Sequence, residues 1–375
     1  MSLAIAGIGW VTPLGAGIGS VWERLLNGEE ASAATISEDF TDRVYNVFRV
    51  PDSAMKGVVH SRLRRASAIS RFGAAAGLHA LEFAGLKLDA QAAQRIALIF
   101  AISNGGVVYT KRFYREIVSA GAHAASPLLF PETVFNAPAS HVAAILGVTG
   151  ATYTLIGDGA VGIAAINMAN ELMKNEALDY CLVVGTEEID WLLCDAYRRW
   201  RLLRAQPPIE PYCKQNRGMI LSEGAGAVLL GRDGLVSVER LHPGGYFSER
   251  SETEKILKVI LRDLCQTEID FVVSSGNGTF IDRAESRALQ EIVPNAFVYT
   301  PKPALGESVG AAGLWQVIAA TQALRSAEIP PVLHIDSSAR LRLARSRTPI
   351  PNAQRAIVLG CGLNQLAAGL RLAIR

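Results

Sequence analysis

The stretch Leu155–Gly162 reads LIGDGAVG, and the surrounding elements are organised around it. An apolar strand turns on glycines and leads directly into the small-residue helix IAAINMANELM at 163–173, and the strand YCLVVGTEE follows at 180–188. Such a turn presents one residue at the strand end, close to the positive end of the helix dipole. Enzymes with a nucleophile elbow place a Ser or Cys there. Here the turn at 157–160 reads GDGA, which contains no good nucleophile.

The composition excludes several classes of protein. Half of the 375 residues are hydrophobic and the formal charge is +2, so bulk electrostatics do not favour nucleic-acid binding. No apolar run reaches about 18 residues, which argues against a membrane span. The five cysteines are scattered without CxxC pairing, so we expect no disulfide framework and no zinc site, and a reducing, cytoplasmic location. The glycine-rich turn at 7–15 lacks the GxGxxG spacing of a nucleotide site, and we expect no metal or other cofactor.

Apolar runs and helical spacing alternate along the chain. Strands are predicted at 2–9, 95–103, 180–188, 219–230, 236–240, 271–275, 296–300 and 356–360, with a last strand or extended tail at 365–375. Helices are predicted at 21–26, 62–86, 111–120, 141–146, 163–173, 192–204, 252–264, 282–292 and 308–324. The second half repeats the order of the first, which predicts two α/β halves, 1–232 and 233–375, with mostly parallel sheets packed through shared helices. The helices after Gly162 and Gly310 are so rich in Ala and Gly that we expect both to be buried between two sheets.

Several blocks resemble β-ketoacyl-ACP synthases of the KAS I/II kind, which have the thiolase fold. The blocks at 4–30 (AIAGIGWVTPLGAGIGSVWERLLNGEE) and 64–86 (RRASAISRFGAAAGLHALEFAGL) are similar to the first strand and helix and to the long basic-headed helix of that family. The blocks at 130–151, 217–230, 277–285, 300–313 and 359–364 resemble the dimer-interface segment, the segment after the central sheet and three C-terminal active-site loops. The resemblance implies two duplicated mixed-sheet halves in a layered αβαβα arrangement.

The resemblance also locates the catalytic positions of the family, which uses a Cys nucleophile, two His and an oxyanion hole. The nucleophile position falls on Gly159, or on Ala160 with a shift of one residue. The two His positions hold Asn277 and Glu307, and the position of a supporting carboxylate holds Gln316. Lys302 matches the family lysine, and Cys361 replaces an aromatic gate residue. The resemblance therefore implies a ketosynthase fold that lacks its catalytic groups and does not condense acyl chains by the family route.

Chain-length-factor-like subunits of the family have this character. They pair with an active ketosynthase, as a heterodimer or heterotetramer, in polyketide, aryl polyene or fatty-acid-type chain elongation. The segment 126–136 matches the loop that crosses to the partner's pocket, which makes Leu128, Leu129, Thr133 and Val134 candidates for lining the acyl channel; ordinary packing of apolar loop residues is the alternative. Acyl carrier proteins are acidic, so the basic residues Arg62, Arg64, Arg65, Arg198 and Arg199 are candidates for docking one; a solvated helix face is the alternative.

Three other interpretations stay open at this point. Asp158 and Glu307 could form an acid/base pair in a rewired pocket, or fill space and bind loop amides. An enzyme of altered chemistry, a thioester hydrolase or decarboxylase, would use Glu307 with Asn277 as an oxyanion donor. A homodimeric acyl-binding scaffold would need no ketosynthase partner. Cys361 has no His in a matching loop to activate it as a displaced nucleophile.

Overall fold

A computed structural model describes residues 3–55, 63, 66–215, 217–234, 236–336 and 339–375. Its centre is an 11-stranded sheet in the order β12-β11-β15-β16-β10-β1-β9-β7-β5-β6, with β2 paired to β1. The first half supplies β1 (Leu3–Thr12), β2 (Gly15–Ala16), β5 (Ile96–Ile102), β6 (Thr152–Ile156), β7 (Tyr180–Glu187) and β9 (Gly224–Gly231). The second half supplies β10 (Val236–Tyr246), β11 (Phe271–Val273), β12 (Phe297–Tyr299), β15 (Arg355–Cys361) and β16 (Leu366–Ile374).

The two halves follow the same plan. In the first half β6, β5 and β7 are parallel, and β9 and β1 continue the sheet antiparallel. In the second half β12, β11 and β15 are parallel, and β16 and β10 continue antiparallel. The halves meet where Leu3–Ile5 of β1 pairs with β10. The duplicated α/β architecture is thus confirmed, whereas the expectation of mostly parallel sheets is wrong because β9 and β16 reverse the strand direction in each half.

Helix α11 (Val309–Ser326) forms the centre of the molecule, and all its residues from Val309 to Leu324 are buried. It packs on β7 and β9 of the first half and on β15 of the second. Helix α6 (Val161–Leu172) packs against α11 at Gly162, where a Cβ would lie 3.1 Å from the backbone nitrogen of Leu314. The predicted burial of a small-residue helix is confirmed for α11. For α6 it is only partly right, because Asn170 and Glu171 lie on a side that solvent reaches.

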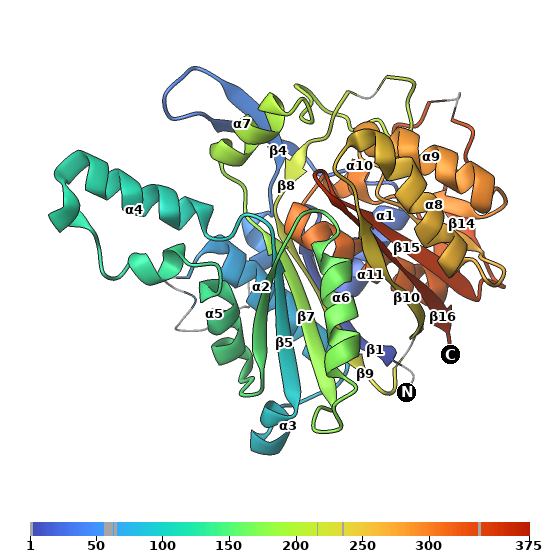
Figure 1. The fold of residues 1–375 in the computed structure, drawn as a ribbon, viewed down its shortest axis with the longest axis horizontal. Helices are drawn as coiled ribbons and strands as arrows, with labels where there is room; N and C mark the ends of the chain where they lie inside the picture. The colour runs from blue at the N-terminus through green and yellow to red at the C-terminus, as the bar shows by residue number, and fades with distance from the viewer. Residues whose placement is uncertain (1–2, 56–62, 64–65, 216, 235, 337–338) are drawn as a thin grey trace.

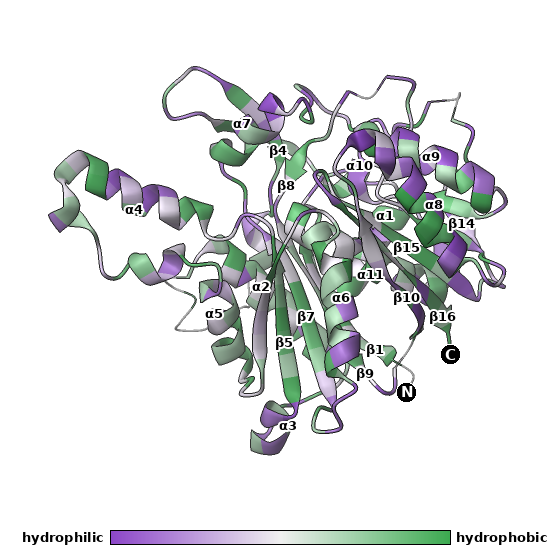
Figure 2. Ribbon diagram, viewed as in Figure 1, coloured by the Kyte–Doolittle hydropathy of each residue, from purple (hydrophilic) through white to green (hydrophobic). Residues whose placement is uncertain are grey.

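Further helices cover the two faces of the sheet (Figure 1). Helix α2 (Ala68–Phe83) packs on β1, β9 and α5 (Ala137–Leu146), and α8 (Thr253–Leu264) packs on β10, β16 and α9 (Phe280–Ile292). Figure 2 shows the apolar character of β5 and β7 and the alternating polar and apolar bands of α9. The remaining elements are α1 (Ile18–Leu26), α3 (Ala90–Gln94), α7 (Trp191–Arg199), α10 (Lys302–Leu305), η1 (Asp52–Met55), η5 (Arg250–Glu252), the sheet β3 (Ala33–Ser37)–β4 (Val44–Phe48)–β8 (Leu221–Ser222) and the pair β13 (Glu328–Ile329)–β14 (Thr348–Pro349).

One segment extends away from the rest of the molecule. Helix α4 (Val107–Ala120) projects sideways, and the chain returns through η3 (Ala122–Ala124) and η4 (Phe130–Thr133) (Figure 1). In α4 none of the residues is buried. None of the described helices combines the length and the apolar character needed to cross a membrane.

Several predicted helix boundaries need correction, and the helices predicted at 111–120 and 141–146 begin earlier, at Val107 and Ala137. The helix predicted at 62–86 begins at Ala68, after Ser67, whose side chain accepts a hydrogen bond from the Ser70 amide and caps the first turn. The helix predicted at 192–204 ends at Arg199, because Arg201 takes a positive φ of 57° and Leu203 bridges to Met219. The last segment is a strand, β16, and not an extended tail.

Candidate functional site at the strand–helix elbow

The elbow between β6 and α6 faces the loop that follows β15. A Cβ built on Gly159 would lie 3.2 Å from the carbonyl oxygen of Cys361 and 3.6 Å from the Cα of Gly362. The backbone of this loop therefore occupies the space in front of the elbow. A side chain at position 159 needs the loop to move by a few tenths of an ångström, so glycine suits this close approach.

Asp158 fastens the same loop to the elbow. Its Oδ2 accepts hydrogen bonds from the backbone amides of Asn364 (3.1 Å) and Gln365 (3.3 Å). A Cβ on Gly362 would lie 2.0 Å from both carboxylate oxygens, so that position is restricted to glycine. Burial raises the pKa of Asp158, and the backbone donors oppose this shift. These contacts are those of a carboxylate that binds loop amides and not those of an acid/base pair with Glu307.

Three of the positions singled out in the sequence meet in one buried cluster, which we call the 277–302–307 cluster. Glu307 Oε2 accepts from Asn277 Nδ2 at 2.7 Å and from Lys302 Nζ at 2.6 Å. The Lys302 and Glu307 side chains are 2% and 1% exposed. The Asn277 Oδ1 accepts from the hydroxyl of Thr279 at 2.6 Å. The ammonium and the carboxylate neutralise each other away from water, and the amide is engaged at both ends.

Gln316 lies beside this cluster but does not join it. Its Nε2 donates to the carbonyls of Ser274 (2.6 Å) and Leu359 (2.7 Å), and so ties the ends of β11 and β15 to α11. A carboxylate could not make these two bonds, because both partners are acceptors. Glu307 is therefore the residue that neutralises the charge of Lys302, whereas Gln316 binds backbone carbonyls.

Two buried acids that the sequence analysis gave no role shape the loop carrying Asn277. Asp282 accepts hydrogen bonds from the amides of Asn277 and Gly278, and Glu285 accepts from the amide of Ser275. Burial raises the pKa of Asp282 to about 6 and that of Glu285 to about 7. In the sequence, Asp282 and Glu285 could have been recognised as a pair by their spacing of three residues at the start of a helix, which places both side chains on one face of that helix.

A second pair of buried acids ends strand β7. Glu187 Oε2 accepts from the amide of Gly310 at 3.2 Å, and Glu188 Oε2 accepts from the amide of Ile69 at 3.3 Å. Burial raises the pKa of Glu187 to about 8 and that of Glu188 to about 7. Two adjacent carboxyls at the end of an apolar strand were visible in the sequence, but their burial depends on α2 and α11.

Among the described residues, no imidazole belongs to the 277–302–307 cluster, and the Cys361 thiol at the elbow is not activated as a nucleophile. His141 pairs with Glu132 and His334 with Glu30, both at 2.7 Å. Cys361 is buried, and burial holds the pKa of its thiol well above the usual range, so its thiolate is disfavoured. Within the described ranges no set of three His, Cys, Asp or Glu side chains is arranged to hold a metal ion.

The candidate channel residues do not share one environment. Leu128 is 78% and Val134 40% exposed, whereas Leu129 is buried at 9%. Thr133 donates its hydroxyl to the carbonyl of Phe130 at 2.7 Å. Leu129 therefore packs within its own chain. Between α4 and β6 the other exposed large apolar side chains are Tyr114, Val118, Phe130, Phe135, Tyr153 and Ile156. Elsewhere in the described residues Phe40, Val44, Leu78, Leu192, Trp200, Tyr246 and Val259 are exposed as well.

The candidate docking arginines separate in a similar way. Arg198 and Arg199 both form ion pairs with Asp195, at 2.8 and 2.6 Å, so one buried carboxylate already partners both. Arg62, Arg64 and Arg65 lie outside the described residues.

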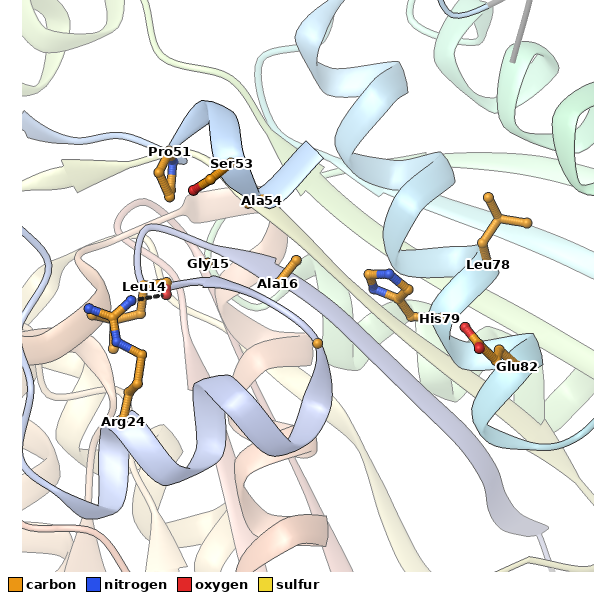
Figure 3. A pocket seen from close by; sticks show the side chains of 11 residues that line it. Leu14, Gly15, Ala16, Arg24, Pro51, Ser53, Ala54, Leu78, His79 and Glu82 are labelled. Carbon is orange, nitrogen blue, oxygen red and sulfur yellow. Dashed lines mark hydrogen bonds between the residues drawn. The ribbon is translucent and has the colours of Figure 1, made fainter. Parts of the chain in front are cut away.

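One open pocket of about 720 Å³ lies away from the elbow, between the β1–α1 turn, η1 and α2. Figure 3 shows His79 and Glu82 on one side of it and Arg24 on the other. Arg24 is engaged by the carbonyl of Leu14 and by Glu29. The ionisable side chains of this pocket do not converge on one point, so we assign it no chemistry.

Family models identify the class of this protein. The β-ketoacyl synthase N-terminal domain matches residues 2–234, and the β-ketoacyl synthase C-terminal domain matches residues 237–336. The chain therefore belongs to the β-ketoacyl synthase family, which confirms the resemblance and the thiolase-like fold.

Individual relatives are distant in sequence but match most of the chain. The 3-oxoacyl-[acyl-carrier-protein] synthase 2 of Coxiella burnetii is 23% identical over 89% of this chain and 88% of its own length. Nodulation protein E of Rhizobium sp. (strain N33) is 24% identical over 88% of this chain and 87% of its own length. Among solved structures, the ishigamide ketosynthase/chain length factor superimposes with a TM-score of 0.84 at 21% identity, covering 100% of this chain and 99% of the other. A β-ketoacyl synthase from Burkholderia phymatum STM815 gives a TM-score of 0.86 at 18% identity with the same coverage.

Proposed function

We propose that this chain is a non-catalytic β-ketoacyl synthase-like subunit of the chain-length-factor type. It pairs with an active β-ketoacyl synthase and shapes that enzyme's acyl pocket during fatty-acid- or polyketide-type chain elongation, with an acyl carrier protein delivering the growing chain. The observation that carries the proposal is Gly159 at the elbow, packed so closely on the next loop that an added Cβ would lie 3.2 Å from the carbonyl oxygen of Cys361. A covalent thioester requires a thiol or hydroxyl at that point.

The chemistry of the 277–302–307 cluster supports the same conclusion. Decarboxylation and enolate stabilisation in this family need proton donors that are free to reach the substrate. Here the Asn277 amide and the Lys302 ammonium both donate to Glu307, and all three side chains are buried. The described cluster holds no imidazole. The hydrogen bonds of the cluster hold its own loops together, and no group in it is left free to act as the acid or base of the family reaction.

The exposed apolar surface supports a partner. Val118 of α4, Leu128 of the returning loop and Ile156 of β6 are 86%, 78% and 53% exposed, and β6 is the last strand of the large sheet. A free edge strand beside apolar side chains favours association with another chain. The name of one structural neighbour couples a ketosynthase with a chain length factor. That of another describes a type II polyketide synthase acyl-carrier protein in complex with its ketosynthase.

Co-expression tests the proposal. The chain is produced alone and together with a candidate partner ketosynthase that carries Cys and two His, and the complex is analysed by size-exclusion chromatography with light scattering. A 1:1 complex whose product length changes with substitutions in the exposed segment supports the proposal. Condensation of acyl- and malonyl-carrier substrates by the purified chain alone contradicts it.

The same preparation decides between the alternatives. Glu307 Oε1 has no hydrogen-bond partner among the described residues, which keeps a hydrolase open. Acyl-thioester hydrolysis by the isolated chain that is lost in Glu307→Gln would assign it to that class. A stable homodimer that ignores the ketosynthase would indicate a scaffold.

A further inference from the structure

A second pocket lies on the outer side of the second half, where α8, α9 and the segment before β8 meet. It has a volume of about 680 Å³, and the side chains that matter are Lys214, Arg250, Glu254, Phe280, Arg283 and Arg287. We call it the α8–α9 pocket. Helices α8 and α9 pack directly on each other, and Figure 1 shows them together at the outer edge of the molecule.

The charges that line this pocket are strongly unbalanced. Four of the lining side chains are cationic and one, Glu254, is anionic. Glu254 is already bound by Arg287 at 3.1 Å and by Lys258 at 2.8 Å. Within the described residues, Lys214 and Arg283 have no ion-pair partner, and Arg250 meets no carboxylate. Three positive charges therefore line one concavity without a described carboxylate at ion-pair distance, and Lys214 also lines the neighbouring pocket, to which Glu210 and Asp336 contribute.

Several other exposed arginines of the described residues have a carboxylate partner, although Arg71, Arg201 and Arg345 do not. What distinguishes the α8–α9 pocket is that several cationic side chains gather in one place. Arg198 and Arg199 share Asp195, Arg347 binds both Glu328 and Glu23, and Arg262 binds Glu291. Like charges gathered in one place repel each other and produce a positive potential that attracts anions. Arg283 and Lys214 are exposed, so the packing of their side chains does not offset this repulsion.

The shape and the lining groups indicate the kind of anion. Arg250 donates to the carbonyl of Trp200 at 3.2 Å and stacks over the Phe280 ring at 4.9 Å, which fixes its guanidinium at the pocket wall. Guanidinium groups bind phosphate oxygens through paired hydrogen bonds, and a lysine adds a point charge. The pocket is open to solvent, and its volume of about 680 Å³ leaves room for a small molecule. Phe280, which is half-buried and on which Arg250 stacks, supplies the aromatic part of the lining beside the cations.

We infer that the α8–α9 pocket binds a small phosphate ester carrying two or more negative charges, held by Lys214, Arg250 and Arg283. Binding needs only this chain, so it can be measured whether or not the proposed subunit role is correct. The attraction is electrostatic at an exposed site, so the affinity falls as the salt concentration rises.

Isothermal titration calorimetry of the full chain with inorganic pyrophosphate and with ADP tests the inference. Arg283→Gln and Lys214→Gln are each expected to weaken binding about tenfold, the loss that accompanies one charge-assisted hydrogen bond. The matched control is Arg262→Gln, an exposed arginine of α8 that binds Glu291 and does not line the pocket; its affinity should stay within about twofold of the parent. Circular dichroism verifies that each variant is folded.

The outcomes are decisive in both directions. Binding of both probes, with tighter binding of ADP, supports an ester whose organic part contacts Phe280. Binding of pyrophosphate without ADP overturns the assignment to an ester. Absence of heat at about 1 mM of either probe, or equal weakening by Arg283→Gln and Arg262→Gln, overturns the site itself.

Discussion

Replacing Glu307 by Leu tests whether the 277–302–307 cluster holds the loops together. The carboxylate is 1% exposed and binds the Lys302 ammonium at 2.6 Å and the Asn277 amide at 2.7 Å. Glu307→Leu leaves an ammonium that is 2% exposed without its counter-charge and an amide without its acceptor. Removing one partner of a buried ion pair costs about 3–5 kcal/mol of unfolding free energy.

The double variant Lys302→Met with Glu307→Leu separates the ion pair from the amide. It removes both charges, and replacing a buried pair by apolar side chains of similar size is often neutral or stabilising. The remaining cost is the unpaired Asn277 amide, about 1–3 kcal/mol. The double variant should therefore be more stable than Glu307→Leu alone, even though it carries one substitution more.

Urea unfolding, followed by circular dichroism and tryptophan fluorescence, measures these differences. The control is Glu23→Leu, which breaks an exposed pair with Arg347 at 3.0 Å and should cost less than about 1 kcal/mol. If Glu307→Leu costs no more than the control, or if the double variant is less stable than the single one, the cluster does not have the structural role deduced from its burial.

Three further changes probe the elbow, the buried acids and the exposed surface. Gly159→Cys should destabilise the chain by about 1–3 kcal/mol, because its Cβ meets the Cys361 carbonyl at 3.2 Å. The variant should still not condense acyl substrates, because the 277–302–307 cluster holds no imidazole to act as acid or base; condensation of acyl- and malonyl-carrier substrates by the variant would contradict this. Glu187 has its pKa raised from 4.5 to about 8, so the folded state binds more protons than the unfolded state between these values and stability should fall as pH rises from about 4.5 to 8. Glu187→Gln should flatten that slope in unfolding measurements at several pH values, and an unchanged slope would show that Glu187 is not the titrating group. Val118→Asp, at a side chain 86% exposed, should leave the unfolding midpoint of the isolated chain unchanged but weaken the proposed complex with a ketosynthase in the light-scattering assay; full complex formation would exclude α4 from the proposed interface.

The order of the main elements and the chemistry of the elbow follow from the sequence without any structure. Hydrophobic runs such as 95–103 and 180–188 are long enough to require burial on both faces, and each became a strand of the large sheet. The Ala- and Gly-rich segment at 308–324 required a crowded position and became the buried α11. The absence of a thiol or hydroxyl from 157–160 is visible in the residues themselves.

Which side chains meet depends on the folded chain. Asn277 and Glu307 are 30 positions apart and come together because their loops follow β11 and β12, neighbouring parallel strands that end on the same side of the sheet. Asp195 takes up the charges of Arg198 and Arg199, and Leu129 turns inward although Leu128 beside it stays exposed. The uncompensated charges of Lys214, Arg250 and Arg283 come from three separate segments. Spacing along the chain predicts strands and helices because it is a local property, whereas charge pairing and burial depend on segments that only the fold brings together.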